Sequence, residues 1–171
     1  MKIIAAFPCL GKTTVYNLNN KRCFDRKFDI KKSLRGMGQR EALRFFDCCA
    51  EIISLQYKMD AYEVMFIDAD DRLIKRIGND PAIKRDLTVV FPNVLDKNVL
   101  EEYLIRATNF YGTYWVNENI KNELDALPAR IKSFKDEGFD IRLTSLTQKY
   151  MHEVVNLPGG FITPGEEDGI Y

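Results

Sequence analysis

Residues 2–14 have the sequence KIIAAFPCLGKTT, in which an apolar run is followed by a loop with one proline and one glycine. A short, almost uninterrupted apolar run is typical of a strand that is covered on both faces, as in a parallel sheet. Beyond Gly11, apolar residues recur with helical spacing as far as Leu18. The sequence therefore predicts a buried strand, a tight loop and the start of a helix.

The loop matches the phosphate-binding pattern G-x-x-x-x-G-K-[ST] at every fixed position except the first, where Ala6 replaces glycine. Gly11 allows the backbone to approach an anion, and the first amides of the following helix direct N–H groups at a phosphate. Lys12 is expected to reach the β and γ phosphates of ATP, and the Thr13 hydroxyl to bind the accompanying Mg²⁺. The predicted nucleotide-binding residues are Ala6, Phe7, Pro8, Cys9, Leu10, Gly11, Lys12, Thr13 and Thr14.

Two features of this motif leave alternatives open. An alanine at position 6 strains the loop if its φ is positive and costs little if its backbone is extended. A strand, a GKT sequence and a helix can also occur together by chance in a structural protein.

Along the rest of the chain, short β-branched segments alternate with segments of helical periodicity. Strands are expected at 22–25, 62–67, 87–91 and 139–143, and helices at 39–57, 71–77, 96–107, from 117 with a bend or break at Pro128, and at 145–155. Such alternation indicates a parallel sheet with helices on both faces. The prediction is an α/β, three-layer fold with about five mainly parallel strands, in one domain spanning 1–171, with an irregular tail at 156–171.

The 171 residues include 25 basic and 25 acidic side chains, which give a formal net charge of zero. This balance argues against a globally basic nucleic-acid binder, so direct nucleic-acid binding is not expected. No apolar run approaches the roughly 18–20 residues that a bilayer requires, and no signal-peptide pattern is present. The four cysteines lack metal-ligand spacing. A cytoplasmic protein with reduced thiols and no membrane contact is expected, and the oligomeric state stays open.

Residues 1–13 resemble the start of small phage and bacterial P-loop proteins of the nucleoside monophosphate kinase group, related to adenylate kinase. These often begin with an apolar strand followed by F-P-G-x-G-K-[ST], and Cys9 stands where that pattern commonly has glycine. The resemblance implies a P-loop fold with a short helical lid at about 97–117 and ATP and Mg²⁺ as cofactors. It also implies transfer of the γ-phosphate to a small-molecule substrate, with a nucleoside or deoxynucleoside monophosphate as the best candidate.

The resemblance further implies an acidic residue at the end of a central strand, which holds the magnesium shell or the substrate. Asp68 directly follows the apolar run at 64–67, and Asp25 ends the predicted second strand, where such kinases often begin their acceptor pocket. Asp70 is an alternative to Asp68, although it also fits a helix N-cap. Asp25 equally fits a simple turn role.

Phosphoryl transfer spreads negative charge over the moving oxygens, so guanidinium groups are the expected catalytic stabilisers. Arg40 and Arg44 lie one helical turn apart and can face one phosphate together, or they can belong to a solvated helix face. By the resemblance, Arg106 lies in the N-terminal arm of the lid, whereas Arg130 lies far along the next helix.

Three further expectations concern individual side chains near these segments. Tyr111, Tyr114 and Trp115 either stack on a base or form core under the lid. The Cys9 thiol is expected to have a lowered pKa because it lies beside a helix N-terminus. His152 is not a candidate base.

Two alternatives to a nucleotide kinase remain at this point. The chain can be a nucleotide-binding or regulatory module without transfer activity, or a kinase of another small molecule such as a sugar or nucleoside.

Overall fold

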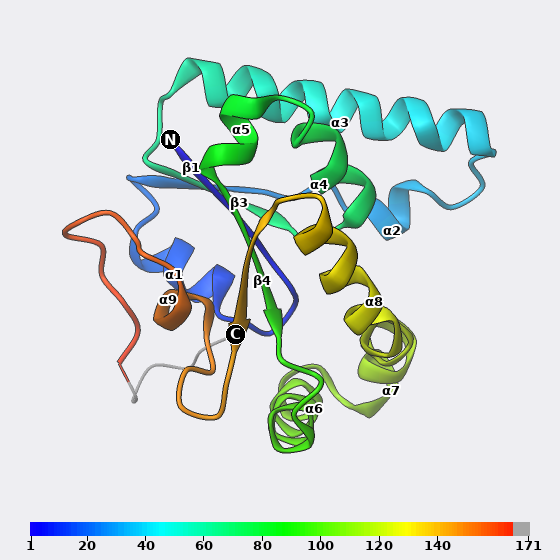
Figure 1. Ribbon diagram of the computed structural model, residues 1–171, viewed down its shortest axis with the longest axis vertical. Coiled ribbons are helices and arrows are strands. Elements are labelled where there is room, and N and C mark those ends of the chain that lie inside the picture. The colour runs from blue at the N-terminus through cyan, green and yellow to red at the C-terminus, as the bar shows by residue number, and fades with distance from the viewer. Residues whose placement is uncertain (166–171) are drawn as a thin grey trace.

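The computed structural model describes residues 1–165, which contain a five-stranded parallel sheet flanked by helices (Figure 1). The strand order is β2-β3-β1-β4-β5, and every neighbouring pair is parallel. The α/β class and the predicted strands are therefore confirmed. The strands are β1 (Lys2–Ala6), β2 (Cys23–Arg26), β3 (Val64–Asp68), β4 (Leu87–Pro92) and β5 (Asp140–Thr144).

Helices lie on both faces of this sheet: Figure 1 shows α3, α4 and α5 on one side and α1 and α9 on the other. A five-residue π-helical segment, η1, interrupts the helices between β4 and β5. The helices are α1 (Lys12–Leu18), α2 (Ile30–Ser33), α3 (Gln39–Met59), α4 (Asp71–Ile77), α5 (Pro81–Asp86), α6 (Lys97–Tyr111), α7 (Thr113–Val116), η1 (Asn117–Lys121), α8 (Asn122–Asp136) and α9 (Met151–Val154).

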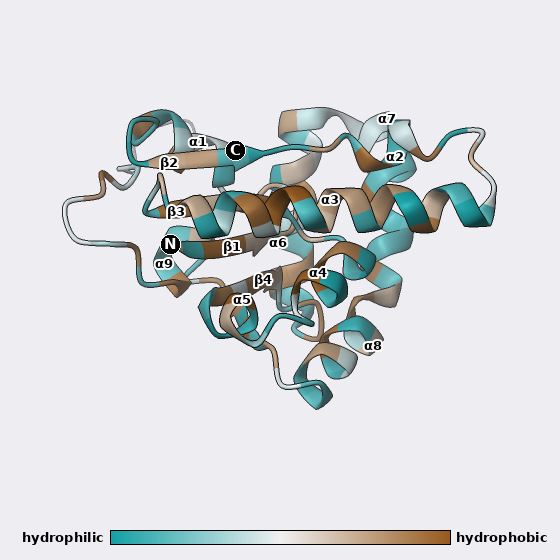
Figure 2. Cartoon of the chain, turned by 90° about the horizontal axis from the view of Figure 1, so that it is seen from above, coloured by the Kyte–Doolittle hydropathy of each residue, from teal (hydrophilic) through white to brown (hydrophobic). Residues whose placement is uncertain are grey.

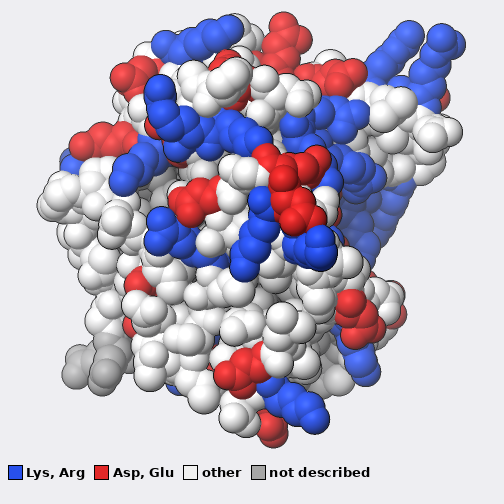
Figure 3. All heavy atoms as spheres, in the orientation of Figure 1, with Lys and Arg blue, Asp and Glu red and all other residues white. Residues whose placement is uncertain are grey.

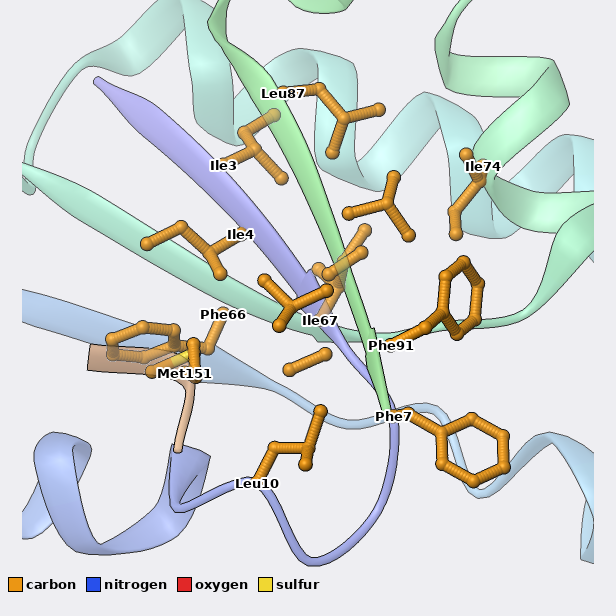
Figure 4. Packing of buried hydrophobic residues seen from close by; sticks show 14 of the residues in the cluster. Ile3, Ile4, Phe7, Leu10, Phe66, Ile67, Ile74, Leu87, Phe91 and Met151 are labelled. Carbon is orange, nitrogen blue, oxygen red and sulfur yellow. The ribbon is translucent and has the colours of Figure 1, made fainter. Parts of the chain in front are cut away.

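The core forms on both faces of the sheet because successive strand residues point in opposite directions. Figure 4 shows Ile3 with Leu87 on one side of β1, and Ile4 with Phe66 and Met151 on the other; all five side chains are buried. In Figure 2 the central strands are apolar, whereas α3 alternates between apolar and polar positions. The helix α3 therefore buries one face only.

The strand register brings the carboxyl ends of β1, β2 and β3 together. Ala6 lies opposite Asp68 on one side and Val90 on the other, and Asp25 lies opposite Phe66. After β1 the chain continues to β2, at one edge of the sheet, and after β4 it continues to β5, at the other edge. In open parallel sheets, ligands bind outside the carboxyl ends of the strands where the connections diverge in this way.

Two helix predictions are wrong. Of the expected bend or break at Pro128, the break does not occur: α8 continues through the proline. The helix buries Leu127 and Phe134, and this packing offsets the cost of a proline in a helix, about 3 kcal/mol. The last helix does not span 145–155 but is confined to α9. A turn precedes it, in which Ser145 Oγ accepts a hydrogen bond from the Gln148 amide.

The region between β4 and β5 is more helical than expected. The aromatic stretch at 109–115 belongs to α6 and α7, which are joined by Gly112, and α7 is followed at 117 by the first residue of η1. The role of this segment as a lid stays a prediction. The helix α5 was also not expected, because Asp80-Pro81 resembles the end of the preceding helix. Asp80 is in fact the N-cap of α5, and its side chain accepts a hydrogen bond from the Ala82 amide at 2.9 Å.

Within residues 1–165, no helix combines the length and the apolar character needed to cross a membrane. Beyond α9, residues 156–165 form neither helix nor strand, as expected. The remaining tail prediction, for 166–171, lies outside the described residues.

Candidate functional site

The loop after β1 has its backbone strain at Cys9 and not at Ala6. Ala6 is the last residue of β1 and pairs in the sheet, so the extended conformation in which alanine costs little is the one observed. Cys9 has φ 62° and Gly11 has φ 84°, both in the left-handed region. Glycine tolerates this region freely, whereas a side chain costs about 1–2 kcal/mol there.

Three successive carbonyl groups of this loop accept hydrogen bonds from distant parts of the chain. The Tyr103 hydroxyl donates to the Pro8 oxygen at 2.9 Å, and Arg106 Nη1 donates to the Cys9 oxygen at 2.7 Å. The Met151 amide donates to the Leu10 oxygen at 2.8 Å. Strained backbone persists where its surroundings over-determine it, and these contacts from α6 and α9 hold the strained loop in place.

The prediction of a reactive Cys9 thiol with a lowered pKa is wrong. The side chain is buried, and this burial raises the pKa of the thiol to about 11. The positive charge of Arg106 and a hydrogen bond with Tyr111 act in the opposite direction but are smaller effects. Desolvation thus outweighs the helix terminus, and Cys9 is held as a neutral thiol.

Lys12, the first residue of α1, is buried between two carboxylates. Its ammonium donates to Asp68 Oδ1 and lies 3.8 Å from Asp25 Oδ1. The two acids differ in access: the Asp25 side chain is 5% exposed and the Asp68 side chain 53%. Thr13 follows in the same turn and is partly exposed. The predicted residues Lys12, Asp25 and Asp68 therefore meet at the carboxyl edge of the sheet.

Asp25 is the most buried acid of this group, and its two oxygens have different surroundings. Lys27 Nζ lies 3.5 Å from Oδ2. Oδ1 is enclosed and accepts no hydrogen bond from any residue in the described chain. A buried carboxylate oxygen without a donor is uncommon in folded proteins.

Asp70 has the capping role that was the alternative to a functional one. Its Oδ1 accepts hydrogen bonds from the amides of Arg72 at 2.9 Å and Leu73 at 3.2 Å, at the start of α4. This carboxylate is occupied by the helix end, which leaves Asp68 as the acid that faces Lys12.

Arg106 reaches the loop and contacts its backbone, whereas its expected role as a stabiliser of the transferring phosphate stays a prediction. Besides its bond to Cys9, the guanidinium lies 3.3 Å from both Glu102 carboxylate oxygens and packs over the Tyr150 ring at 4.6 Å. A partly buried cation with these partners is fixed in orientation. Its observed contacts hold the loop in position.

Arg40 and Arg44 are not brought to the loop. Both lie exposed in the first two turns of α3, and neither forms an ion pair or hydrogen bond with a loop residue within the described chain. The solvated helix face, which was the alternative, is the observed arrangement. In Figure 3, acidic side chains lie among basic ones in the middle of the view, and mostly basic side chains gather at its upper right.

Arg130 lies beside the site, although the sequence placed it too far along its helix. Its Nε donates to Asp71 Oδ1 at 2.7 Å and its Nη2 to the Ala69 oxygen at 2.9 Å. It therefore fixes the turn that directly follows Asp68. No spacing in the sequence indicates this contact, because it depends on α8 running back along the edge of the sheet.

The aromatic residues of α6 and α7 form a stacked group next to the loop. Tyr111 and Trp115 stack with ring centroids 3.9 Å apart, whereas Tyr114 is 80% exposed. Burial, followed by the neighbouring Cys9 and Asp68, raises the pKa of Tyr111 to about 12. Trp115 packs partly on the core, which agrees with the core alternative for this residue, whereas the exposed Tyr114 does not belong to the core. Stacking on a base stays a prediction.

A surface cavity of about 530 Å³ lies at the opposite, amino-terminal edge of the sheet. Its lining includes Lys2, Arg22 and Glu63, and the Met1 amine pairs with Asp60 at 2.9 Å beside it. This cavity is remote from Lys12 and contributes nothing to the site.

Comparison with known proteins gives no match: no family model fits the sequence, and no curated protein or solved structure is significantly similar to it. The function of the chain is therefore inferred from the geometry around Lys12.

Proposed function

We propose that this protein is a small-molecule kinase that binds ATP with Mg²⁺ at the loop after β1 and transfers the γ-phosphate to a small acceptor. The observation that carries the proposal is the buried Lys12. Its ammonium lies at the carboxyl edge of the sheet, next to the central strand, with one acid from each of two neighbouring strands beside it. A buried cation whose hydrogen-bonded partner, Asp68, is half exposed is suited to exchange that carboxylate for a phosphate.

The residues present fit a magnesium ion carried by the nucleotide. Thr13 and Asp68 supply oxygen ligands, which Mg²⁺ prefers, and Asp68 is exposed enough to reach a bound ligand. Within residues 1–165 no cluster of three or more His, Cys, Asp or Glu side chains can hold a metal alone. Mg²⁺ of this kind keeps waters and phosphate oxygens as its other ligands, and it would neutralise charge on the transferring phosphate.

The protein's own residues would then act by positioning. Lys12 leaves Asp68 and binds the donor phosphates, while Arg106 and Tyr103 keep the loop carbonyls turned toward the protein body. Arg130 holds the turn after Asp68. Preorganised charges and fixed geometry are the main contributions that proteins make to phosphoryl transfer. The sequence resemblance favours a nucleoside or deoxynucleoside monophosphate as the acceptor.

A binding module without transfer activity is the second candidate. One observation favours it: within residues 1–165, Lys12, Arg106 and Arg130 are each already paired with a carboxylate.

The substitution Lys12→Ala tests the proposal. We expect calorimetry with MgATP to show a loss of binding of at least 100-fold, and a coupled ADP-release assay to show no turnover. Because Ala leaves the buried Asp25 without its cation, Lys12→Gln serves as a second variant, and Lys32→Ala, an exposed lysine on α2, is the matched control. Unchanged ATP affinity in folded Lys12→Gln contradicts the proposal. Wild-type binding without turnover over a panel of acceptors favours the module.

A further inference from the structure

The long helix α3 is apolar on part of the face that it turns to solvent. Ile52, Leu55 and Met59 are 39%, 55% and 74% exposed, and Cys48, one turn earlier, is exposed as well. In Figure 1 no other element of the described chain lies above α3, and Figure 2, which is seen from above, shows apolar positions along the middle of this helix. Single exposed apolar side chains are common on protein surfaces, but these four lie together in one stripe, which we call the α3 stripe.

The α3 stripe has the spacing of a contact between two helices. Its members follow one another at steps of four, three and four residues, whereas Phe46, Cys49 and Ile53 form the buried face of the same helix. Apolar residues that alternate in this way mark the seam along which two helices coil around each other. Since α3 packs on the protein body through a different face, this spacing points to a helix of a second molecule.

The charged side chains beside the α3 stripe are complementary to a second copy of the same helix. Glu51 and Lys58 lie along one flank of the stripe, both exposed, and neither has an ion-pair or hydrogen-bond partner within residues 1–165. The other flank is turned to the protein body, where Arg26 Nε donates to Gln56 Oε1 at 3.0 Å. Two copies of α3 that run in opposite directions place their open flanks side by side, so Glu51 of each chain meets Lys58 of the other.

The same two charges select one register of the two helices. Where Ile52 packs on the partner's Leu55, Cys48 packs on the partner's Met59, and each Glu51 lies nearest the partner's Lys58. A shift by seven residues in one direction places Glu51 against the partner's Glu51, and a shift in the other direction places Lys58 against the partner's Lys58. Like charges disfavour both shifted arrangements, so the first register combines apolar contact with attraction between the flanks.

We propose that the protein forms a symmetric dimer in which the α3 stripes of two copies pack against each other in opposite directions. This proposal is independent of the proposed kinase function. One stripe per chain covers less than the roughly 1,200–2,000 Å² of a standard interface, so we expect a dissociation constant of about 10–100 µM. The monomer then predominates in dilute solution, and Cys48 stays accessible there.

Sedimentation equilibrium of the full chain over roughly 1–500 µM protein tests the association, because a dimer of this strength forms by mass action within that range. Leu55→Glu places a charge in the α3 stripe and should leave only monomer at every concentration. Leu43→Glu is the matched control, since Leu43 is 50% exposed on the same helix but lies outside the stripe, and it should keep the wild-type dissociation constant. A wild-type protein that stays monomeric, or a dimer that survives Leu55→Glu, overturns the proposal.

Exchange of the two flanking charges tests the register. Glu51→Lys and Lys58→Glu each bring like charges together, so each should raise the dissociation constant at least fivefold. The double variant with both substitutions restores opposite charges and should return to within twofold of wild type. If the double variant dimerises as weakly as the single ones, the register is wrong.

The exposed Cys48 allows a test of helix direction by disulfide formation under mild oxidation. In opposite directions the two Cys48 residues lie eleven positions apart along the helices, about 16 Å, which is too far for a disulfide. The wild type should therefore not cross-link, whereas Met59→Cys places a thiol beside the partner's Cys48 and should give a covalent dimer. Adding Cys48→Ser should abolish that dimer. A cross-linked wild type indicates parallel helices and overturns the proposal, as does Met59→Cys that fails to cross-link.

Discussion

The reactivity of Cys9 allows a sharp test of the loop geometry. The chain has four free thiols, of which only Cys48 is exposed. Burial raises the pKa of Cys9 from 9.0 to about 11. At pH 8 the thiolate fraction therefore falls about 100-fold, and the greater nucleophilicity of a thiolate of higher pKa recovers about tenfold of this. We expect Cys9 to react at least about tenfold more slowly than an ordinary thiol, before steric exclusion is counted.

The assay is titration with a chromogenic disulfide reagent at pH 8, in native buffer and in denaturant. The native protein should show one fast equivalent, which Cys48→Ser removes, and the unfolded protein should show four. Alkylation with iodoacetamide followed by peptide mapping identifies each site. Rapid labelling of Cys9 in the native protein, at a rate within tenfold of the unfolded chain, would refute the buried loop and restore the sequence-based expectation of a sensitive thiol.

The remaining predictions concern stability and are measured by urea or thermal unfolding. Because burial raises the pKa of the three buried thiols to about 11, the stability that they contribute is complete below pH 9 and is lost as pH rises through 11. A free energy of unfolding that stays flat over this pH range contradicts this. Gly78→Ala places a Cβ 2.5 Å from two ring carbons of Phe139 and should cost about 1–3 kcal/mol, partly recovered by adding Phe139→Leu. Asp70→Ala removes the cap of α4 and should cost about 1 kcal/mol. Arg130→Gln should cost about 1–3 kcal/mol, and less when Asp71→Asn is already present.

Much of the fold follows from patterns that are local in the sequence. The buried strands and the long helix α3 are recognisable because their periodicity reflects which faces are covered. The meeting of Asp25 and Asp68 was predictable for a related reason, since the carboxyl ends of parallel strands share one edge of the sheet. Their common contact with Lys12 follows from the position of the loop after the central strand.

The parts that could not be predicted depend on packing between distant segments. Pro128 is tolerated inside α8 because of side chains that the helix buries, and periodicity alone does not report their contribution. Arg130 reaches the turn after Asp68 through the path of the whole helix, 61 residues from the carbonyl that it binds. The pKa of Cys9 depends on α6 covering the loop, so the local rule for a thiol near a helix start gave the wrong direction.

The loop itself is therefore a product of the whole chain. Its motif occupies eight residues, yet its strained residue Cys9 is held by hydrogen bonds to the carbonyls around it from Tyr103, Arg106 and Met151, which lie more than 90 positions away. A strained conformation relaxes when its supports are removed, so the loop can keep its shape only while α6 and α9 are docked. If the loop binds phosphate as proposed, nucleotide binding and the docking of these two helices must then be thermodynamically linked, because each favours the same loop conformation.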